Sequence, residues 1–161
     1  KCDGFAKITA NPYEKRICKC LYYHNSKHPK RCETCKDPYQ FDIIGDYRIV
    51  DYEVPAFYDG PGIGEIDLVL SGDEKLYAVE VKPPKQKTPE SLLRMIAEII
   101  TYTVGFPEGK YRRAIAFFED SPQEIEYQNC TPELPDILQQ AKITVFRFEK
   151  HGGNVYKICK L

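Results

Sequence analysis

The chain of 161 residues has the length of one ordinary domain, and its 42% hydrophobic residues are enough to bury a single core. This composition excludes a disordered chain, and no apolar run reaches the roughly 18 residues that a membrane helix needs. The net charge of −1 hides an uneven distribution: residues 1–36 hold nine Lys/Arg against three Asp/Glu, and the other 125 residues hold fourteen against twenty-one. A basic segment beside an acidic body is typical of proteins that contact phosphates with one part, although a solvated lysine-rich face would give the same counts. The chain begins with Lys1 and shows no signal-peptide pattern, and it is compatible with a piece of a longer chain or complex.

The first forty residues are rich in Lys, Cys, His and Tyr and show no clear helical or strand period. We predict a basic, cysteine-rich metal-binding module over 1–40 and a separate domain over 41–161, because the composition changes at Phe41. Cations and tyrosines alternate in this module, as on surfaces that bind the phosphates and bases of nucleic acids. The same tyrosines could instead form the module's small core.

Four of the seven cysteines lie within eighteen residues. These are Cys18, Cys20, Cys32 and Cys35. The odd total speaks against a disulfide framework and favours a reducing, cytoplasmic compartment. Two closely spaced pairs are the pattern of a zinc knuckle or ribbon, so we predict that the four thiolates hold a structural Zn²⁺. His24 and His28 lie between the pairs and could replace one cysteine, and four free thiols are the alternative.

The pattern from residue 41 onward predicts strands grouped around one long helix. This helix is expected to begin near Thr88-Pro89-Glu90, with Thr88 as N-cap, and to end at Gly105. A second, short helix is expected around 132–140. Runs rich in β-branched and aromatic residues predict strands at 47–54, 63–71, 75–82, 112–118, 142–149 and 154–160. Strands before and after a central helix favour an α/β fold with a central mixed sheet flanked by helices.

The predicted hairpin at 63–82 carries the most information. A loop at Gly72-Asp73-Glu74-Lys75 sets Ser71 opposite Leu76 and, further from the turn, Asp67 opposite Glu80. Lys82 then lies on the same face as these two acids. The other face is predicted to belong to the core and holds Ile66, Leu68, Leu70, Tyr77, Val79 and Val81.

Asp67 and Glu80 would have Cβ atoms about 5 Å apart, and like charges at this separation destabilise a sheet. A divalent cation removes the repulsion, because two close carboxylates form an oxygen-rich site for Mg²⁺ or Mn²⁺. Lys82 would then stabilise charge on a phosphate under attack, or position the attacking water. A register shifted by two residues would instead pair Lys82 with Asp67 in an ordinary salt bridge.

This pattern resembles the motif of the PD-(D/E)XK nuclease superfamily. An aspartate at one strand of a hairpin (Gly64-Glu65-Ile66-Asp67-Leu68) is followed by Glu80-Val81-Lys82 in the next. The later helix has Glu98 and Tyr102 four residues apart, which is similar to the Gln-x-x-x-Tyr motif of the RecB-type exonuclease branch, with Glu98 in place of glutamine. The resemblance covers roughly residues 47–118.

The resemblance implies a restriction-endonuclease-like core and a role for each residue of the motif. Asp67 and Glu80 would be metal ligands, Val81 would contribute its carbonyl oxygen, and Lys82 would be catalytic. Glu98 and Tyr102 would position substrate or metal. Many members of the superfamily have a further upstream acid, and the sequence leaves it open among Glu14, Asp51, Glu53 and Glu65. Some RecB-type nucleases carry an iron–sulfur cluster, which is a further alternative for the cysteines.

From the residues and the resemblance we expect a Mg²⁺- or Mn²⁺-dependent nuclease, with DNA favoured over RNA and no membrane association. A nuclease fold without activity, whose zinc knuckle binds nucleic acid, is the second hypothesis. The third is an interaction module without affinity for DNA. The pattern does not distinguish endonuclease from exonuclease activity.

Overall fold

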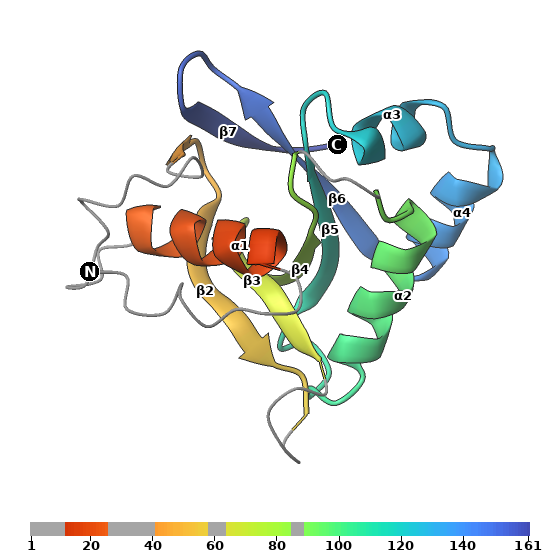
Figure 1. Cartoon of the computed structure of the whole chain (residues 1–161). Coiled ribbons are helices and arrows are strands. Elements are labelled where there is room, and N and C mark those ends of the chain that lie inside the picture. Colours follow the sequence, from red (N-terminus) through yellow and green to blue (C-terminus); the bar gives the residue numbers. More distant parts are fainter. Residues whose placement is uncertain (1–11, 26–40, 58–63, 85–88) are drawn as a thin grey trace.

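The computed structural model describes residues 12–25, 41–57, 64–84 and 89–161 (Figure 1). These residues form a mixed sheet of seven strands in the order β1-β7-β6-β5-β4-β3-β2. The strands are β1 (Asp42–Ile44), β2 (Arg48–Pro55), β3 (Glu65–Gly72), β4 (Lys75–Val81), β5 (Arg112–Phe118), β6 (Ile143–Lys150) and β7 (Val155–Lys160). The helices of the described part are α1 (Pro12–Asn25), α2 (Leu92–Thr103), α3 (Pro122–Gln128) and α4 (Glu133–Gln140). None of these helices is long and apolar enough to cross a membrane. The predicted α/β architecture, a mixed sheet flanked by helices, is confirmed.

The centre of the sheet is parallel and its flanks are largely antiparallel. Strands β4, β5 and β6 run in one direction, and β1 runs parallel to β7. The pairs β2–β3, β3–β4 and β6–β7 are antiparallel. All residues from Ala114 to Phe118 of β5 are buried, because a central parallel strand is covered on both faces. This explains why the sequence of β5 is a nearly continuous apolar run.

Helix α1 covers one face of the sheet, and α2 and α4 lie on the opposite side (Figure 1). Leu68 and Tyr77 pack on the α1 side, whereas Val69 and Ala78 pack on the α2 side. Neighbouring residues of β3 and β4 therefore face different helices, as strand alternation requires. Of the six residues predicted to share the first core face, Ile66 packs in the other core.

Helix α1 corrects the expectation that the N-terminal segment lacks a helical period. Ile17, Cys18 and Leu21 are 0% exposed and pack in the core on the α1 side of the sheet. Their spacing places them on one helix face. The prediction missed this face because Cys18 was counted as a metal ligand, whereas a cysteine buried in a core behaves as a small hydrophobic residue. The predicted boundary at residue 40 stays a prediction, since 26–40 lie outside the described residues.

Helix α2 begins later than predicted. Pro89 and Glu90 precede it, Ser91 is the N-cap, and the Ser91 hydroxyl accepts a hydrogen bond from the Arg94 amide at 3.3 Å. Thr88, the predicted N-cap, lies outside the described residues. The other predicted strands and helices agree with the structure to within about two residues, whereas α1, β1 and α3 were not predicted.

The predicted register of the β3–β4 hairpin is confirmed. Ser71 pairs with Leu76, and the ladder continues to the pair Leu68–Val79. The turn is tighter than expected, because Gly72 also pairs with Lys75 and only two residues, both with positive φ, form the connection. The register is nevertheless the same, so the next step away from the turn sets Asp67 beside Glu80. The slip by two residues does not occur.

Candidate functional site

The ends of β3 and β4 bring the three residues of the predicted site together. Asp67 is half-buried on β3, and its Oδ2 atom accepts a hydrogen bond from the Val81 amide at 2.8 Å. Glu80 on β4 and Lys82 directly after it are each only 2% exposed. The Lys82 Nζ atom lies 2.6 Å from Glu80 Oε1. A charged lysine and a carboxyl group are therefore enclosed at the edge of the hydrophobic core.

Helix α2 and the segment before it add two more carboxylates. Lys82 Nζ lies 3.4 Å from Glu98 Oε2 and 3.0 Å from Glu90 Oε2. Arg94 bridges the same two acids, with Nε 3.0 Å from Glu98 Oε1 and Nη1 3.3 Å from Glu90 Oε1. We call Asp67, Glu80, Lys82, Glu90 and Glu98 the carboxylate cluster.

Glu90 is the site residue that the sequence reasoning missed. The predicted helix began near Glu90, so this residue was assigned to the first helical turn and no contact with the hairpin was expected. The signal that could have found it is its spacing, because Glu90, Arg94, Glu98 and Tyr102 follow one another at four-residue intervals. Such residues lie along one line of a helix surface, and the line here points at Lys82.

Burial dominates the electrostatics of Glu80. Burial, and after it the negative charge of Asp67, raise the pKa of Glu80 well above its usual range, and the nearby Lys82 only partly opposes them. Burial also acts to raise the pKa of Glu98, but the neighbouring Glu80 carboxyl and the charges of Lys82 and Arg94 outweigh it and lower that pKa. Glu80 therefore holds a proton in preference to Glu98. The Oε2 atom of Glu80 is buried and receives no hydrogen bond within the described part of the chain.

Tyr102, predicted to assist the site, packs against the start of β3. A Cβ atom added to Gly64 would lie 2.5 Å from Tyr102 Cε1, so the ring rests directly on the glycine backbone. Burial first, and then the acids Glu98 and Glu80, raise the pKa of Tyr102, which keeps its hydroxyl protonated. The phenol is thus a neutral polar group beside a set of acids.

We expect Gly64→Ala to displace the Tyr102 ring and to destabilise the protein. Gly64 has φ +115°, a conformation that costs a residue with a side chain about 1–3 kcal/mol, and the clash with the ring adds to this. Gly109→Ala is the matched control, because Gly109 also has a positive φ but no atom within 4 Å of the added Cβ. Urea unfolding followed by circular dichroism measures both. If Gly64→Ala lowers the free energy of unfolding no more than Gly109→Ala does, the packing argument is contradicted.

The carboxylate oxygens of Asp67 and Glu80 are the candidate ligands for a divalent cation. Among the residues that the structure describes, no three His, Cys, Asp or Glu side chains are grouped as a metal site. The chemistry of Asp67 and Glu80 nevertheless fits Mg²⁺ or Mn²⁺, which prefer carboxylate oxygens, and the buried Glu80 Oε2 has an unused acceptor position. The carbonyl of Val81 stays a predicted ligand.

The structure does not show the predicted zinc module in its described residues. Cys18 and Cys20 are buried in α1 without a disulfide bond in the described part of the chain, and Cys18 lies in the hydrophobic core. His24 contacts Asp42, with Nε2 2.8 Å from Oδ1. Cys32, Cys35 and His28 lie outside the described residues, so the Zn²⁺ site stays a prediction.

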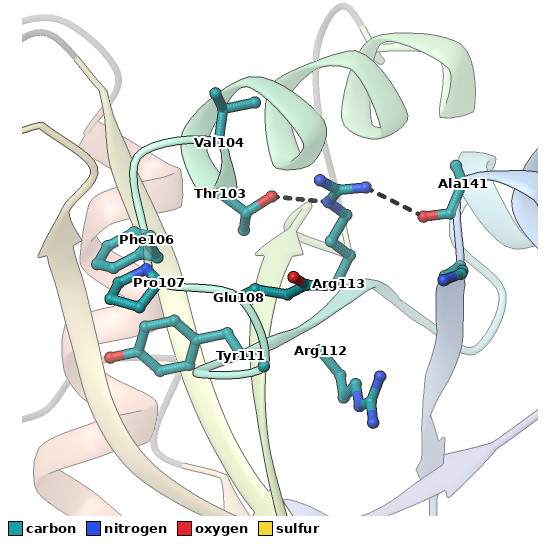
Figure 2. A pocket seen from close by; sticks show the side chains of 11 residues that line it. Thr103, Val104, Phe106, Pro107, Glu108, Tyr111, Arg112, Arg113 and Ala141 are labelled. Carbon is teal, nitrogen blue, oxygen red and sulfur yellow. Dashed lines mark hydrogen bonds between the residues drawn. The ribbon is translucent and has the colours of Figure 1, made fainter.

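A separate pocket of about 430 Å³ lies at the other end of α2 and contains none of the predicted site residues (Figure 2). Arg113 is one of the residues that line this pocket. The Arg113 guanidinium donates to Thr103 Oγ1 at 2.9 Å and to the Ala141 carbonyl at 3.3 Å. Thr103 is the last residue of α2 and Ala141 is the C-cap of α4. Arg113 therefore joins the C-terminal ends of two helices, where a positive charge is favourable.

Arg113→Met is expected to destabilise the protein by about 1–2 kcal/mol, because two hydrogen bonds and a favourable charge at the helix ends are lost. Arg112→Met, at the exposed neighbouring position, should change the free energy of unfolding much less. Denaturant unfolding of both variants measures the difference. Equal effects of the two substitutions would show that Arg113 does not connect the helices.

Comparisons with known proteins do not show a family for this chain. No family model matches the sequence, and no curated protein matches it. A solved structure, the Ca²⁺ complex of SfsA from Pyrococcus furiosus, matches with 17% identity and a TM-score of 0.33. The match covers 71% of this chain and 53% of that chain, which is about half the length of that protein. A similarity at this level supports no functional conclusion.

Proposed function

We propose that the chain is a metal-dependent nuclease of the PD-(D/E)XK type that hydrolyses phosphodiester bonds in DNA. The observation that supports this most strongly is Lys82, which is 2% exposed and surrounded by the carboxylates of Glu80, Glu90 and Glu98. Removing several charges from water costs free energy that their mutual attraction repays only in part. Three acids enclosed around one lysine, two of them (Glu80 and Glu98) with shifted pKa values, are therefore better explained by function than by stability.

Each residue has a role in this proposal. Asp67 and Glu80 would hold Mg²⁺ or Mn²⁺, with the Val81 carbonyl as a further ligand. When bound, the cation supplies Lewis acidity and lowers the pKa of a coordinated water. Lys82 places its ammonium beside the same carboxylates, where it stabilises negative charge on the phosphate group. Glu98 holds the lysine from α2, Arg94 in turn pairs with Glu98, and Tyr102 offers a neutral hydroxyl.

The balance of charge in the cluster predicts how substrate binds. Around Lys82 the carboxylates outnumber the cations, so the site repels the phosphate backbone until a divalent cation is added. We therefore expect DNA to bind more tightly with a divalent cation than with EDTA. A site that binds DNA equally well without metal would disagree with this account.

The test uses circular and linear DNA, single- and double-stranded, and RNA of the same sequences, with Mg²⁺, with Mn²⁺ or with EDTA. We expect cutting of DNA with either cation and none with EDTA. Asp67→Asn should remove the cutting, whereas Asp136→Asn, at an exposed position of α4, should not. Metal-independent cutting, or full activity of Asp67→Asn, would overturn the proposal. Binding without cutting would instead select a nuclease fold that only binds nucleic acid.

A further inference from the structure

Glu90 contacts Lys82 although its backbone precedes helix α2, so the helix does not fix where Glu90 lies. It lies two residues before Leu92, the first residue of α2, and is separated from it by the N-cap Ser91. Its backbone is thus outside the regular helix. Its carboxylate nevertheless lies 3.0 Å from Lys82 Nζ and 3.3 Å from Arg94 Nη1, and the side chain is only 21% exposed. Other contacts must hold this segment in place.

Helix α3 provides these contacts from more than thirty residues away in the sequence. The Gln123 Nε2 atom donates to the carbonyl oxygen of Glu90 at 2.9 Å. The amide of Leu92 donates to Glu126 Oε2 at 3.0 Å. The two hydrogen bonds flank Ser91 on either side, and the Gln123 side chain is 0% exposed. The segment that carries Glu90 is therefore held at both ends by one short helix.

Helix α3 is itself anchored on the sheet. The Ser121 hydroxyl accepts from the Glu124 amide at 3.2 Å, and Glu124 Oε2 accepts from the Asp120 amide at 2.6 Å. The same Glu124 contacts Arg147 of β6, with Nη1 3.1 Å from Oε1. Ser121 is 0% and Glu124 5% exposed, so this anchor is buried. Helix α3 thus links the segment that carries Glu90 to strand β6 of the sheet.

We propose that Glu90 is a functional acidic residue of the site, beside Asp67, Glu80 and Glu98, and that Gln123 is a positioning residue that acts through Glu90. This inference rests on the proposed nuclease function. Glu90 contributes a negative charge that favours a divalent cation and holds the Lys82 ammonium beside Glu80. Gln123 donates a hydrogen bond to the backbone carbonyl of Glu90, and its effect on the site passes through this backbone.

The test is a double-mutant cycle with the wild type, Glu90→Gln, Gln123→Leu and the double variant. Two readouts are measured: Mn²⁺ affinity by isothermal titration calorimetry, and the rate of metal-dependent DNA cleavage. Removing the Glu90 charge is expected to weaken Mn²⁺ binding about tenfold. Gln123→Leu should weaken it in the same direction, and it should cause no further loss when Glu90 is already glutamine.

Two further variants complete the double-mutant experiment. Glu126→Ala removes the other hydrogen bond at a less buried position, and it replaces Gln123→Leu if that variant does not fold. Glu133→Gln, at the exposed start of α4, controls for the loss of a distant charge and should leave Mn²⁺ affinity unchanged. An equal loss from the α3 variant in both backgrounds overturns the inference and leaves the nuclease proposal standing. A wild type that neither binds Mn²⁺ nor cuts DNA overturns the nuclease proposal and this inference with it.

Discussion

Lys82→Met is expected to reduce metal-dependent DNA cleavage by roughly 10²–10³-fold, the usual cost of removing one group that stabilises transition-state charge. The methionine keeps the apolar stem of the lysine, so the loss isolates the ammonium group. Lys150→Met, at an exposed position of β6, is the matched control and should cleave at the wild-type rate. Initial rates on linear double-stranded DNA measure the effect. Cleavage by Lys82→Met within about threefold of the wild type would exclude the catalytic role that we assign to Lys82.

The same substitution should also destabilise the fold. Without the ammonium group, the enclosed carboxylates of Glu80, Glu90 and Glu98 lose their shared cation, and breaking a buried ion pair typically costs about 3–5 kcal/mol. Acids whose pKa is raised in the folded state stabilise it at low pH and lose that contribution as pH rises. The difference in the free energy of unfolding between the wild type and Lys82→Met should therefore become smaller as pH falls from 7.5 to 5. Addition of Mn²⁺ should also reduce it, because the cation binds only the folded protein.

The fold and the hairpin site were predictable because the sequence there leaves little freedom. Apolar residues alternate on both sides of the turn, and a slip by one residue would turn Leu68 and Val79 from one face of the sheet to the other. That constraint sets Asp67 beside Glu80 and directs Lys82 to the same face. The apolar stripe of α2, which includes Ile96 and Ile99, likewise predicts a helix that buries one face in the core.

The rest of the site could not be predicted because it depends on contacts between distant segments. Glu90 keeps the four-residue spacing of Arg94 and Glu98 but precedes the helix, and the hydrogen bonds that hold its segment come from Gln123 and Glu126 of α3. The capping pattern Ser121-Pro122-Gln123-Glu124 was visible in the sequence and predicts a helix start, but not where that helix packs. Helix α1 was hidden for another reason, since its inward-facing Cys18 has two physical interpretations, metal ligand or core residue.

Glu80→Gln should have opposite effects on stability and on activity. The substitution removes a buried charge next to Asp67, while the amide oxygen can still accept the hydrogen bond from Lys82. We expect the free energy of unfolding at pH 7.5 to rise by about 0.5–2 kcal/mol, the usual gain when a destabilising functional residue is replaced. DNA cleavage and Mn²⁺ binding should be lost, because a neutral amide is a poor ligand for a hard cation.

The pH dependence of the Glu80→Gln effect follows from the raised pKa of Glu80. In the unfolded chain this carboxyl titrates near 4.5, whereas in the folded protein its pKa is well above that value. Between the two values the folded state holds a proton that the unfolded state has lost, so the wild type loses stability as pH rises through this window. Glu80→Gln lacks this proton. Its advantage over the wild type should therefore be smallest near pH 4, grow with pH, and level off above the folded-state pKa.

A second buried glutamate provides the control that separates a functional acid from a structural one. Glu124 is 5% exposed, pairs with Arg147 and accepts a hydrogen bond from the Asp120 amide. Glu124→Gln weakens these interactions, so it should lower the free energy of unfolding at pH 7.5, where Glu80→Gln raises it. Urea titrations of both variants across pH 4–9 measure the contrast. If Glu80→Gln is destabilised as much as Glu124→Gln, then Glu80 belongs to a stabilising ion pair with Lys82, and the strain that we attribute to the site does not exist.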